Sequence, residues 1–484
     1  MAEGTDRGSL WGIVWSAVER FSVQGIQFLI SIVIARHLLP SEYGLIGMLA
    51  IFLAIAQTFI DGGFSNALIQ NQERNDVDFS TAFYFNAAMS TVLYLSLYFC
   101  ADLIADFYRQ PELKSLTRII GINLIINGLT IVQKAKLSIQ LDFKTQAKAS
   151  VIAVTVGGSV GILLAYQDFG AWALVIQTLL TSSVNTVLLW ILTKWTPLLI
   201  FSYQSFTRLF SYGSRVLFTS LVNTVYGNLY GLVIGRRFSS LEVGYYTRSY
   251  SLAQFPSSNI MEVISRALFP ILCKIQDTNE LRSKFVGYLR SSCFIVFPLM
   301  SLLFAVSQDL IQILLTSKWQ GASSLLQLLS IAYLIFPIMA VNNEILWARA
   351  RTDLMVRSEI LRKVIATIIL LSLLPFGVKM VCLGLIISNI ADASISIFFS
   401  YKVIKVSVLE QLKVVFPMFV SSGLMVLLIL FIITKYIDVP LLRFVVSIIL
   451  GPIFYLFCCW FLKVKELRLL IDKGMQIIAR EKKY

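Results

Sequence analysis

Long apolar runs, each about the length of a bilayer-crossing helix, follow one another along almost the whole chain. A helix needs roughly 20 mostly apolar residues to cross the hydrocarbon core of a membrane. About fourteen such runs fit the 484 residues,. The pattern predicts an all-α integral membrane protein with about 14 transmembrane helices, in two six-helix bundles plus two C-terminal helices. The predicted helices are centred near Phe28, Ile55, Val92, Ile125, Val154, Leu180, Val225, Phe255, Phe297, Leu334, Ile369, Ile387, Leu427 and Phe454.

Two stretches of the chain repeat one another 200 positions apart, each where one apolar run ends and the next begins. The matched positions are Ile34 and Ile234, Arg36 and Arg236, Glu42 and Glu242, Gly44 and Gly244, Ser65 and Ser265, Ala67 and Ala267, and Leu68 and Leu268. A further echo matches Asp102-Leu103-Ile104 with Asp309-Leu310-Ile311. Many secondary transporters consist of such a duplicated multi-span unit around a central site. We therefore expect a six-helix bundle over 1–200, its repeat over 201–406, and two further transmembrane helices with a basic cytoplasmic tail over 407–484.

Composition agrees with a membrane protein. Hydrophobic residues make up 57% of the chain and charged residues 14%, against about 25% charged in a soluble domain,. The first apolar run carries Glu19 and Arg20 and lacks a small-residue cleavage site, so we expect it to be retained as the first span,. The six cysteines include no C-x-x-C pair, and His37 is the single histidine, which argues against a metal site or a histidine-based triad,. We expect no catalytic residue and no metal ligand.

The net charge of +14 is concentrated on alternate loops. The basic loop and tail residues include Lys144 and Lys148, Lys274, Arg282, Lys284 and Arg290, Arg349 to Lys363, Lys402 to Lys413, and Lys463 to Lys483. In an even-span arrangement all of these loops lie on one side, which the positive-inside rule assigns to the cytoplasm. Both termini are therefore predicted to be cytoplasmic. Topology and anionic lipid headgroups explain the charge without nucleic acid as a partner.

Polar side chains form stripes inside several predicted spans. In the first span Ser16, Arg20, Gln24, Gln27 and Ser31 share one helical face,. An arginine at mid-span costs about 2.5–3.5 kcal/mol on insertion scales, so it normally faces a bundle interior or a watery cavity. The other candidates for this cavity are Asp61, Arg118, Asn123, Asn127, Arg215, Asn223, Glu262, Arg266 and Asp392.

The polar stripes are also compatible with a purely structural role. Uncharged polar side chains hold helices together, each contributing about 1 kcal/mol. Glu262 and Arg266 lie four positions apart and can neutralise one another,. Arg118 and Arg215 have no acidic residue three or four positions away, but both can lie near an interface and extend toward water,. Arginines without a partner favour an anionic ligand such as a phosphate, and nearby amides suit a ligand rich in hydroxyls.

Four segments carry a resemblance to a known superfamily: WSAVERF from Trp15, GFSNALIQ from Gly63, GAWALV from Gly170, and RALFP from Arg266. With them the chain resembles polysaccharide transporters of the multidrug/oligosaccharidyl-lipid/polysaccharide exporter superfamily. It is most similar to the branch of Wzx-type O-antigen and colanic-acid flippases and teichuronic acid exporters. The resemblance covers nearly the whole length. Among site residues it implies only that Arg20 lines a headgroup cavity.

The resemblance implies a flippase that moves undecaprenyl-diphosphate-linked oligosaccharide units across the bacterial inner membrane by alternating access, for polysaccharide or lipopolysaccharide biosynthesis. Its implied partners are the lipid-linked substrate, membrane lipids, and a polysaccharide polymerase with its chain-length machinery. No cofactor is expected, and coupling to an ion stays open, because Asp61 does not match the family's cation-binding acidic position. One alternative is a multidrug or metabolite antiporter of the same fold. A membrane glycosyltransferase or polymerase is less favoured because the outer loops are short, and a structural partner of such an enzyme is a third alternative.

Overall fold

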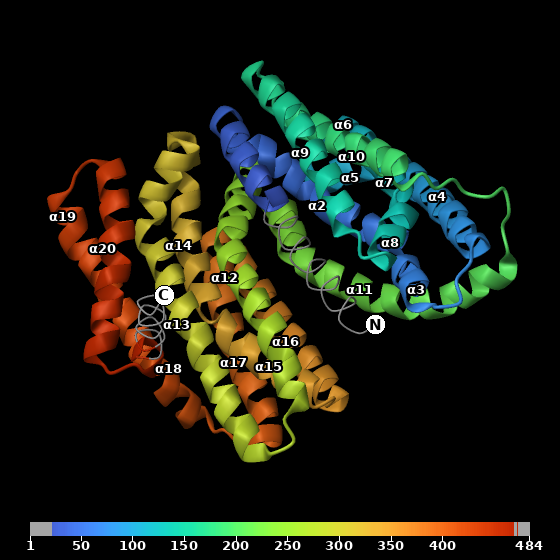
Figure 1. The fold of residues 1–484 in the computed structure, drawn as a ribbon. Coiled ribbons are helices and arrows are strands. Elements are labelled where there is room, and N and C mark those ends of the chain that lie inside the picture. Colours follow the sequence, from blue (N-terminus) through green and yellow to red (C-terminus); the bar gives the residue numbers. More distant parts are fainter. Residues whose placement is uncertain (1–21, 469–471, 473–484) are drawn as a thin grey trace, which may run out of the picture. The chain divides into compact units, whose positions relative to one another are not determined.

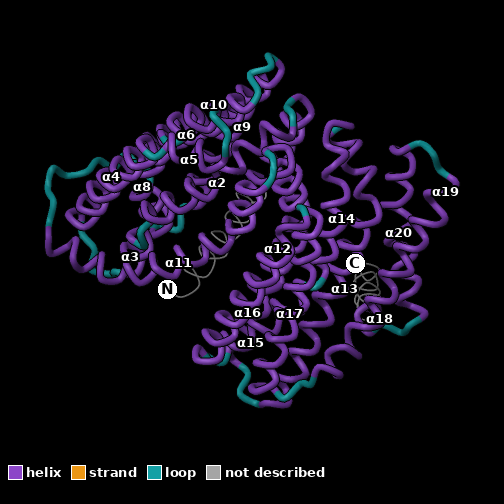
Figure 2. The backbone as a smooth tube through the Cα atoms, turned by 180° about the vertical axis from the view of Figure 1, so that it is seen from behind, coloured by secondary structure: helices purple, strands orange, loops and turns teal. Residues whose placement is uncertain are grey.

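A computed structural model of the protein describes residues 22–468 and residue 472. Helices account for nearly all of this part of the chain, and it contains no strand (Figure 2). The all-α fold predicted from the apolar runs is therefore confirmed. Contacts divide the molecule into two compact units, residues 1–244 (unit 1) and 245–484 (unit 2).

The described part of unit 1 begins with a helix over residues 22–37. It continues with α2 (Pro40–Asp61), α3 (Phe64–Gln70), α4 (Asp76–Phe99), α5 (Ala101–Tyr108), α6 (Glu112–Ile120), α7 (Ile122–Gly128), α8 (Ile131–Ile139), α9 (Phe143–Tyr166), α10 (Ala171–Thr193) and α11 (Tyr203–Arg237). These helices are coloured blue to green in Figure 1. Helix α11 packs along α2 and α3.

Helix α12 (Ser240–Lys274) contains the boundary between the two units. Unit 2 continues with α13 (Thr278–Leu315), α14 (Gln320–Leu334), α15 (Phe336–Ala348), α16 (Thr352–Leu373), α17 (Val378–Ile404), α18 (Val408–Leu427), the π-helical segment Leu428–Ile433, α19 (Thr434–Tyr436) and α20 (Pro440–Phe461). Short 3-10 turns precede α14 and α17. The boundary at 244 follows packing. The boundaries at 200 and 406, which follow the repeat, stay a prediction.

Each of the fourteen predicted centres falls on a helix. Eleven helical segments of the described chain are long and apolar enough to cross a membrane. The three remaining centres lie on the helix over 22–37, on α12 and on α16. The chain is a multi-pass membrane protein, and its total of about fourteen spans stays a prediction.

Local sequence explains where many helices begin. Side-chain oxygens of Asn75, Asp142, Ser202, Asp277 and Ser407 accept hydrogen bonds from backbone N–H groups in the first turns of α4, α9, α11, α13 and α18. The first N–H groups of a helix have no partner inside the helix, so such caps fix its start. The polar breaks between apolar runs are therefore helix starts as well as loops.

The repeated Glu and Gly positions have clear structural roles, and both copies lie in unit 1. Glu42 Oε2 accepts a hydrogen bond from Leu39 N at 2.6 Å, and Glu242 Oε2 accepts one from Ser239 N at 3.3 Å, so each glutamate caps its own helix,. A Cβ atom on Gly44 would lie 1.7 Å from the carbonyl oxygen of Ser240, and one on Gly244 would lie 1.8 Å from that of Pro40. The two copies thus pack against each other reciprocally, and only glycine permits this backbone approach.

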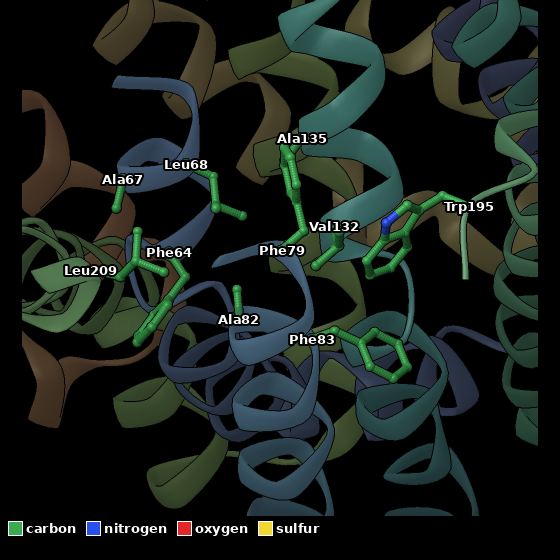
Figure 3. Packing of buried hydrophobic residues seen from close by; sticks show 10 residues of the cluster. All are labelled: Phe64, Ala67, Leu68, Phe79, Ala82, Phe83, Val132, Ala135, Trp195 and Leu209. Atoms are coloured by element: carbon green, nitrogen blue, oxygen red, sulfur yellow. The ribbon is translucent and has the colours of Figure 1, made fainter. Parts of the chain in front are cut away.

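A hydrophobic cluster joins α3, α4, α8 and α11 in unit 1 (Figure 3). Phe64 and Leu68 of α3 pack with Phe79 and Phe83 of α4, and Trp195 from the α10–α11 connection closes the group. Phe64 stacks on Phe85 with ring centroids 4.5 Å apart. Side-chain packing of this kind joins helices inside a membrane, because lipid supplies no hydrophobic drive between them. The cluster anchors α3, whose first turn also borders a polar pocket.

In unit 2, α18 and α20 pack on α13 (Figure 1). Three polar contacts join α13 to α20 and to the segment just after it: Asp309 with Arg443, the Phe294 carbonyl with the Tyr455 hydroxyl at 3.1 Å, and Arg290 with Glu466 at 3.4 Å. Their order along the two helices requires α13 and α20 to be antiparallel. The C-terminal helices are therefore fastened to α13 by polar contacts.

Candidate substrate pocket in unit 1

A polar pocket of about 460 Å³ lies among α2, α3, α7, α8 and α11. Its wall includes Gln57, Thr58 and Asp61 at the C-terminal end of α2, and Gly63, Ser65 and Asn66 at the start of α3. Asn127 of α7, Ile131 and Lys134 of α8, and Val216, Leu217 and Ser220 of α11 complete it. The structure thus brings together two predicted site residues, Asp61 and Asn127.

Hydrogen bonds connect the side chains of this wall. Asn127 Nδ2 donates to Gln57 Oε1 at 3.2 Å, and Gln57 Nε2 donates to Asp61 Oδ1 at 3.0 Å. Lys134 lies close enough to Asp61 to interact with it electrostatically. A row of amide, carboxylate and ammonium groups inside a bundle can exchange hydrogen bonds with ligand hydroxyls and attract one anionic group. The pocket is suited to a sugar-like or phosphate-bearing ligand.

Asn123 precedes Asn127 by one turn of α7, and its Oδ1 is buried without a hydrogen-bond partner in the described residues. In the helix over 22–37, Gln24 Oε1 is also buried without such a partner, whereas Gln27 is exposed. Ile26, Ile30 and Ile34 of the same helix belong to an apolar cluster with Val154 and Ala173 of α9 and α10.

Gln27 therefore lies on an exposed face of that helix, whereas the side-chain oxygen of Gln24 is buried. Arg20 and Ser16, which would extend the polar stripe, lie outside the described residues.

Arg118 has an acidic partner that helical spacing could not indicate. Its Nη2 lies 3.2 Å from Asp102 Oδ2, and its guanidinium stands 4.5 Å from the centre of the Tyr98 ring. Lys114 Nζ binds the other oxygen of Asp102 at 2.6 Å. The hydrogen bond from Lys114 holds the pKa of the Asp102 carboxyl below its usual value,. Arg118 thus belongs to a charge cluster of α5 and α6, and it does not line the pocket of unit 1.

Arg215 and Asn223 lie on exposed positions of α11. Arg215 precedes the pocket residue Val216, and its guanidinium makes no ion pair with any described residue. The Arg215 carbonyl accepts a hydrogen bond from Thr219 at 3.2 Å. Arg215 therefore offers a full positive charge on the helix that forms one wall of the pocket.

In unit 2 the predicted pair on α12 is present, with Arg266 Nη2 2.6 Å from Glu262 Oε1. Asp392 of α17 has a buried Oδ1 without a hydrogen-bond partner among the described residues. Between the α12 pair lies Ser265, whose hydroxyl donates to Glu344 of α15. Glu262 and Arg266 therefore neutralise one another in part, as predicted from their spacing. The Arg266 side chain is exposed, and that of Glu262 is partly exposed.

Several pocket residues were not among the predicted site residues, in particular Gln57, Lys134, Asn66 and Ser220. Gln57 shares a stripe with Asp61, and Lys134 lies seven positions after Asn127, on the same side of consecutive helical turns,. Both residues belong to polar stripes of the predicted spans, and that periodicity is the signal that points to them,. Ser220 and Asn66 carry no such signal, since they reach the pocket only through the packing of α11 on α2 and of α3 on α8 and α11.

The fold and the pocket define a multi-pass helical membrane protein with polar, partly charged groups inside its helical bundle. A sequence model of the family described as polysaccharide biosynthesis protein matches residues 33–324, and the chain belongs to this family. The resemblance to polysaccharide transporters drawn from the sequence segments is thereby confirmed.

Two relatives are similar to this chain in sequence, and one solved structure is similar to it in fold. The teichuronic acid biosynthesis protein TuaB of Bacillus subtilis is 27% identical over 346 residues, 71% of this chain and 72% of the relative. The lipopolysaccharide biosynthesis protein WzxC of Escherichia coli K12 is 26% identical over 399 residues, 81% of this chain and 80% of the relative. The fold matches that of the lipid II flippase MurJ in an inward closed conformation with a TM-score of 0.76, 14% identity, and 93% and 99% of the two chains covered.

Proposed function

We propose that the protein is a flippase that moves undecaprenyl-diphosphate-linked oligosaccharide units across the bacterial inner membrane by alternating access. Membership of the polysaccharide biosynthesis family supports this proposal, as do the names of the relatives and the fold of the lipid II flippase MurJ. The observation that carries it is the pocket of unit 1, which places amide, carboxylate and ammonium groups inside a bundle of membrane-crossing helices.

The physical task accounts for such a pocket. A diphosphate with attached sugars must cross about 30 Å of hydrocarbon, and burying bare charge costs tens of kcal/mol. Side chains that hydrogen-bond sugar hydroxyls and pair with phosphate lower that barrier. In this proposal Gln57, Asp61 and Asn127 bind hydroxyls, Lys134 and Arg215 supply positive charge, and Arg20 contacts the diphosphate.

A flipping assay in proteoliposomes tests the pocket. The full chain is reconstituted with a fluorescent undecaprenyl-diphosphate oligosaccharide, and its exposure to a membrane-impermeant reagent is followed in time. Lys134→Gln should slow flipping by at least tenfold, because a hydrogen bond to a charged group is worth about 1.5–3 kcal/mol. Asn127→Leu should slow flipping about fivefold, because a hydrogen bond to a neutral hydroxyl is worth about 1 kcal/mol. The matched control is Lys148→Gln, an exposed lysine of α9 outside the pocket wall, which should flip normally.

Arg20 is tested in cells by outer-leaflet polysaccharide together with membrane abundance. Arg20→Ala should abolish export at normal abundance, and Arg20→Lys should restore it only in part, because a point charge replaces the bidentate guanidinium. Normal export by Arg20→Ala, or a loss that follows loss of protein, would remove Arg20 from the proposed site.

The proposal also places both termini in the cytoplasm, since the basic loops share one side. It also includes transient association with a polysaccharide polymerase and its chain-length machinery. A third part is coupling to a proton or sodium gradient, which is tested by measuring flipping with and without each gradient. The main alternative is a multidrug or metabolite antiporter of the same fold. Transport of organic cations without flipping of the lipid-linked sugar would favour that alternative.

A further inference from the structure

A second pocket, of about 640 Å³, lies in unit 2 against the first turns of α13. Its wall contains Arg282, Lys284 and Arg290 of α13, and Lys465 and Glu466 just after α20. We call it the α13 basic pocket. It shares no residue with the pocket of unit 1. An inference about its ligand therefore does not depend on the flippase proposal.

The charges of the α13 basic pocket are only partly balanced. Arg282 binds Glu410 of α18, and Arg290 Nη1 lies 3.4 Å from Glu466 Oε1. Lys284 and Lys465 are exposed, and neither forms an ion pair with a described residue. Two positive charges therefore remain at the pocket after both arginines are matched, and they favour an anionic ligand.

The buried carboxylate of Glu466 indicates that the ligand also carries a hydrogen-bond donor. The Glu466 side chain is 8% exposed, and its Oε2 is buried with no hydrogen-bond partner among the described residues. Such an acceptor is costly unless a donor reaches it. A ligand that carries a hydroxyl group beside its anionic group would satisfy both Glu466 and the two lysines.

The position of the pocket points to a membrane lipid. It begins next to the start of α13, a candidate membrane span, and it ends a few residues after α20, another such span. Trp460 and Phe461 are exposed at the end of α20, as is typical of aromatic side chains at a membrane–water interface,. Leu268 and Val286 add an apolar part to the wall. Basic pockets between helices at this depth bind anionic headgroups.

We propose that the α13 basic pocket binds the phosphate group of an anionic membrane lipid, with Lys284 and Lys465 pairing with the phosphate. A headgroup hydroxyl donates to Glu466 Oε2. The bound lipid bridges the start of α13 and the segment after α20, and so adds to the polar contacts that hold the C-terminal helices.

Native mass spectrometry of the purified full chain in mild detergent tests this site with phosphatidylglycerol, phosphatidylcholine and free glycerol phosphate. The unmodified protein should bind phosphatidylglycerol at least tenfold more tightly than phosphatidylcholine. Lys284→Gln with Lys465→Gln should weaken phosphatidylglycerol binding about thirtyfold, since each lysine near an anionic surface contributes about 1 kcal/mol. Lys284→Arg with Lys465→Arg should preserve binding.

The control variant, Lys274→Gln with Lys413→Gln, removes the same charge from exposed positions outside the pocket wall and should bind normally. If the control variant loses as much phosphatidylglycerol binding, the loss is an effect of net charge and the proposed site is refuted. Equal binding of the two lipids would also overturn it. If free glycerol phosphate binds as tightly as phosphatidylglycerol, the ligand is a soluble phosphate ester and the assignment to a lipid is wrong.

Discussion

The ion pair between Asp309 and Arg443 allows a quantitative test of how the C-terminal helices are held. Arg443 Nε donates to Asp309 Oδ2 at 2.7 Å, and its Nη2 donates to the other carboxylate oxygen. The Asp309 side chain is only 7% exposed and the Arg443 side chain 17%. Asp309→Asn keeps the shape of the side chain and removes its charge. Arg443 then keeps a largely buried positive charge without its hydrogen-bonded carboxylate, and Asp438 still attracts it.

The structure sets the size of the effect. Removing one partner of a buried ion pair costs about 3–5 kcal/mol. Because Arg443 retains some contact with solvent, we expect a value near the lower limit, about 3 kcal/mol, which is roughly a 150-fold change in the unfolding equilibrium. Replacing both partners by apolar residues removes the need for pairing, so Asp309→Leu with Arg443→Leu should remain within about 1 kcal/mol of the unmodified protein.

Unfolding in mixed micelles with a rising fraction of sodium dodecyl sulfate would measure these differences. The control is Asp353→Asn, whose partner Arg351 forms an ion pair that is well exposed on both sides. Exposed pairs contribute little, so this variant should unfold as the unmodified protein does. If Asp309→Asn is as stable as the control, or if the double leucine variant is less stable than Asp309→Asn, the reasoning that an unpaired Arg443 charge causes the loss of stability is refuted.

Two further predictions concern the repeat and the topology. Gly44→Ala should destabilise the protein by about 1–3 kcal/mol or more, because its Cβ atom would clash with the backbone carbonyl of Ser240,. Thermal unfolding checks this, and Gly227→Ala on α11, where a Cβ atom meets nothing within 4 Å, should be neutral or stabilising,. Reporter fusions after Lys148 and after Tyr484 should be active only with a cytoplasmic reporter. A periplasmic signal at either position would contradict the predicted topology.

Much of the fold was predictable because apolar runs of membrane length specify helices directly. The breaks between runs were also informative. Glu42 and Glu242 recur because each caps a helix, and Gly44 and Gly244 recur because the backbones meet there. The sequence did not reveal that α11 packs on α2 and α3, since a repeat indicates which segments correspond but not which helices touch.

The candidate site was less predictable for a related reason. Helical periodicity identifies residues that share one face, such as Gln57 with Asp61, or Asn123 with Asn127. It carries no information about which faces meet. Arg118 lacked an acidic residue within one turn, yet Asp102 reaches it from α5, sixteen positions earlier in the chain. Asn127 and Asp61 lie on different helices, and the structure joins them through Gln57.

The ion pairs of the arginines limit which positively charged residues can bind a diphosphate ligand. Arg118 is bound to Asp102 and Arg266 to Glu262, so a ligand that used either arginine would have to displace a carboxylate or leave it nearby. That competition weakens the attraction for an anion. Lys134 lies beside Asp61, which offsets part of its charge. Among the predicted arginines with described side chains, only Arg215 keeps an unmatched charge. In the proposed mechanism a second full charge for the diphosphate must come from Arg20, which makes Arg20→Ala the most demanding test of the assignment.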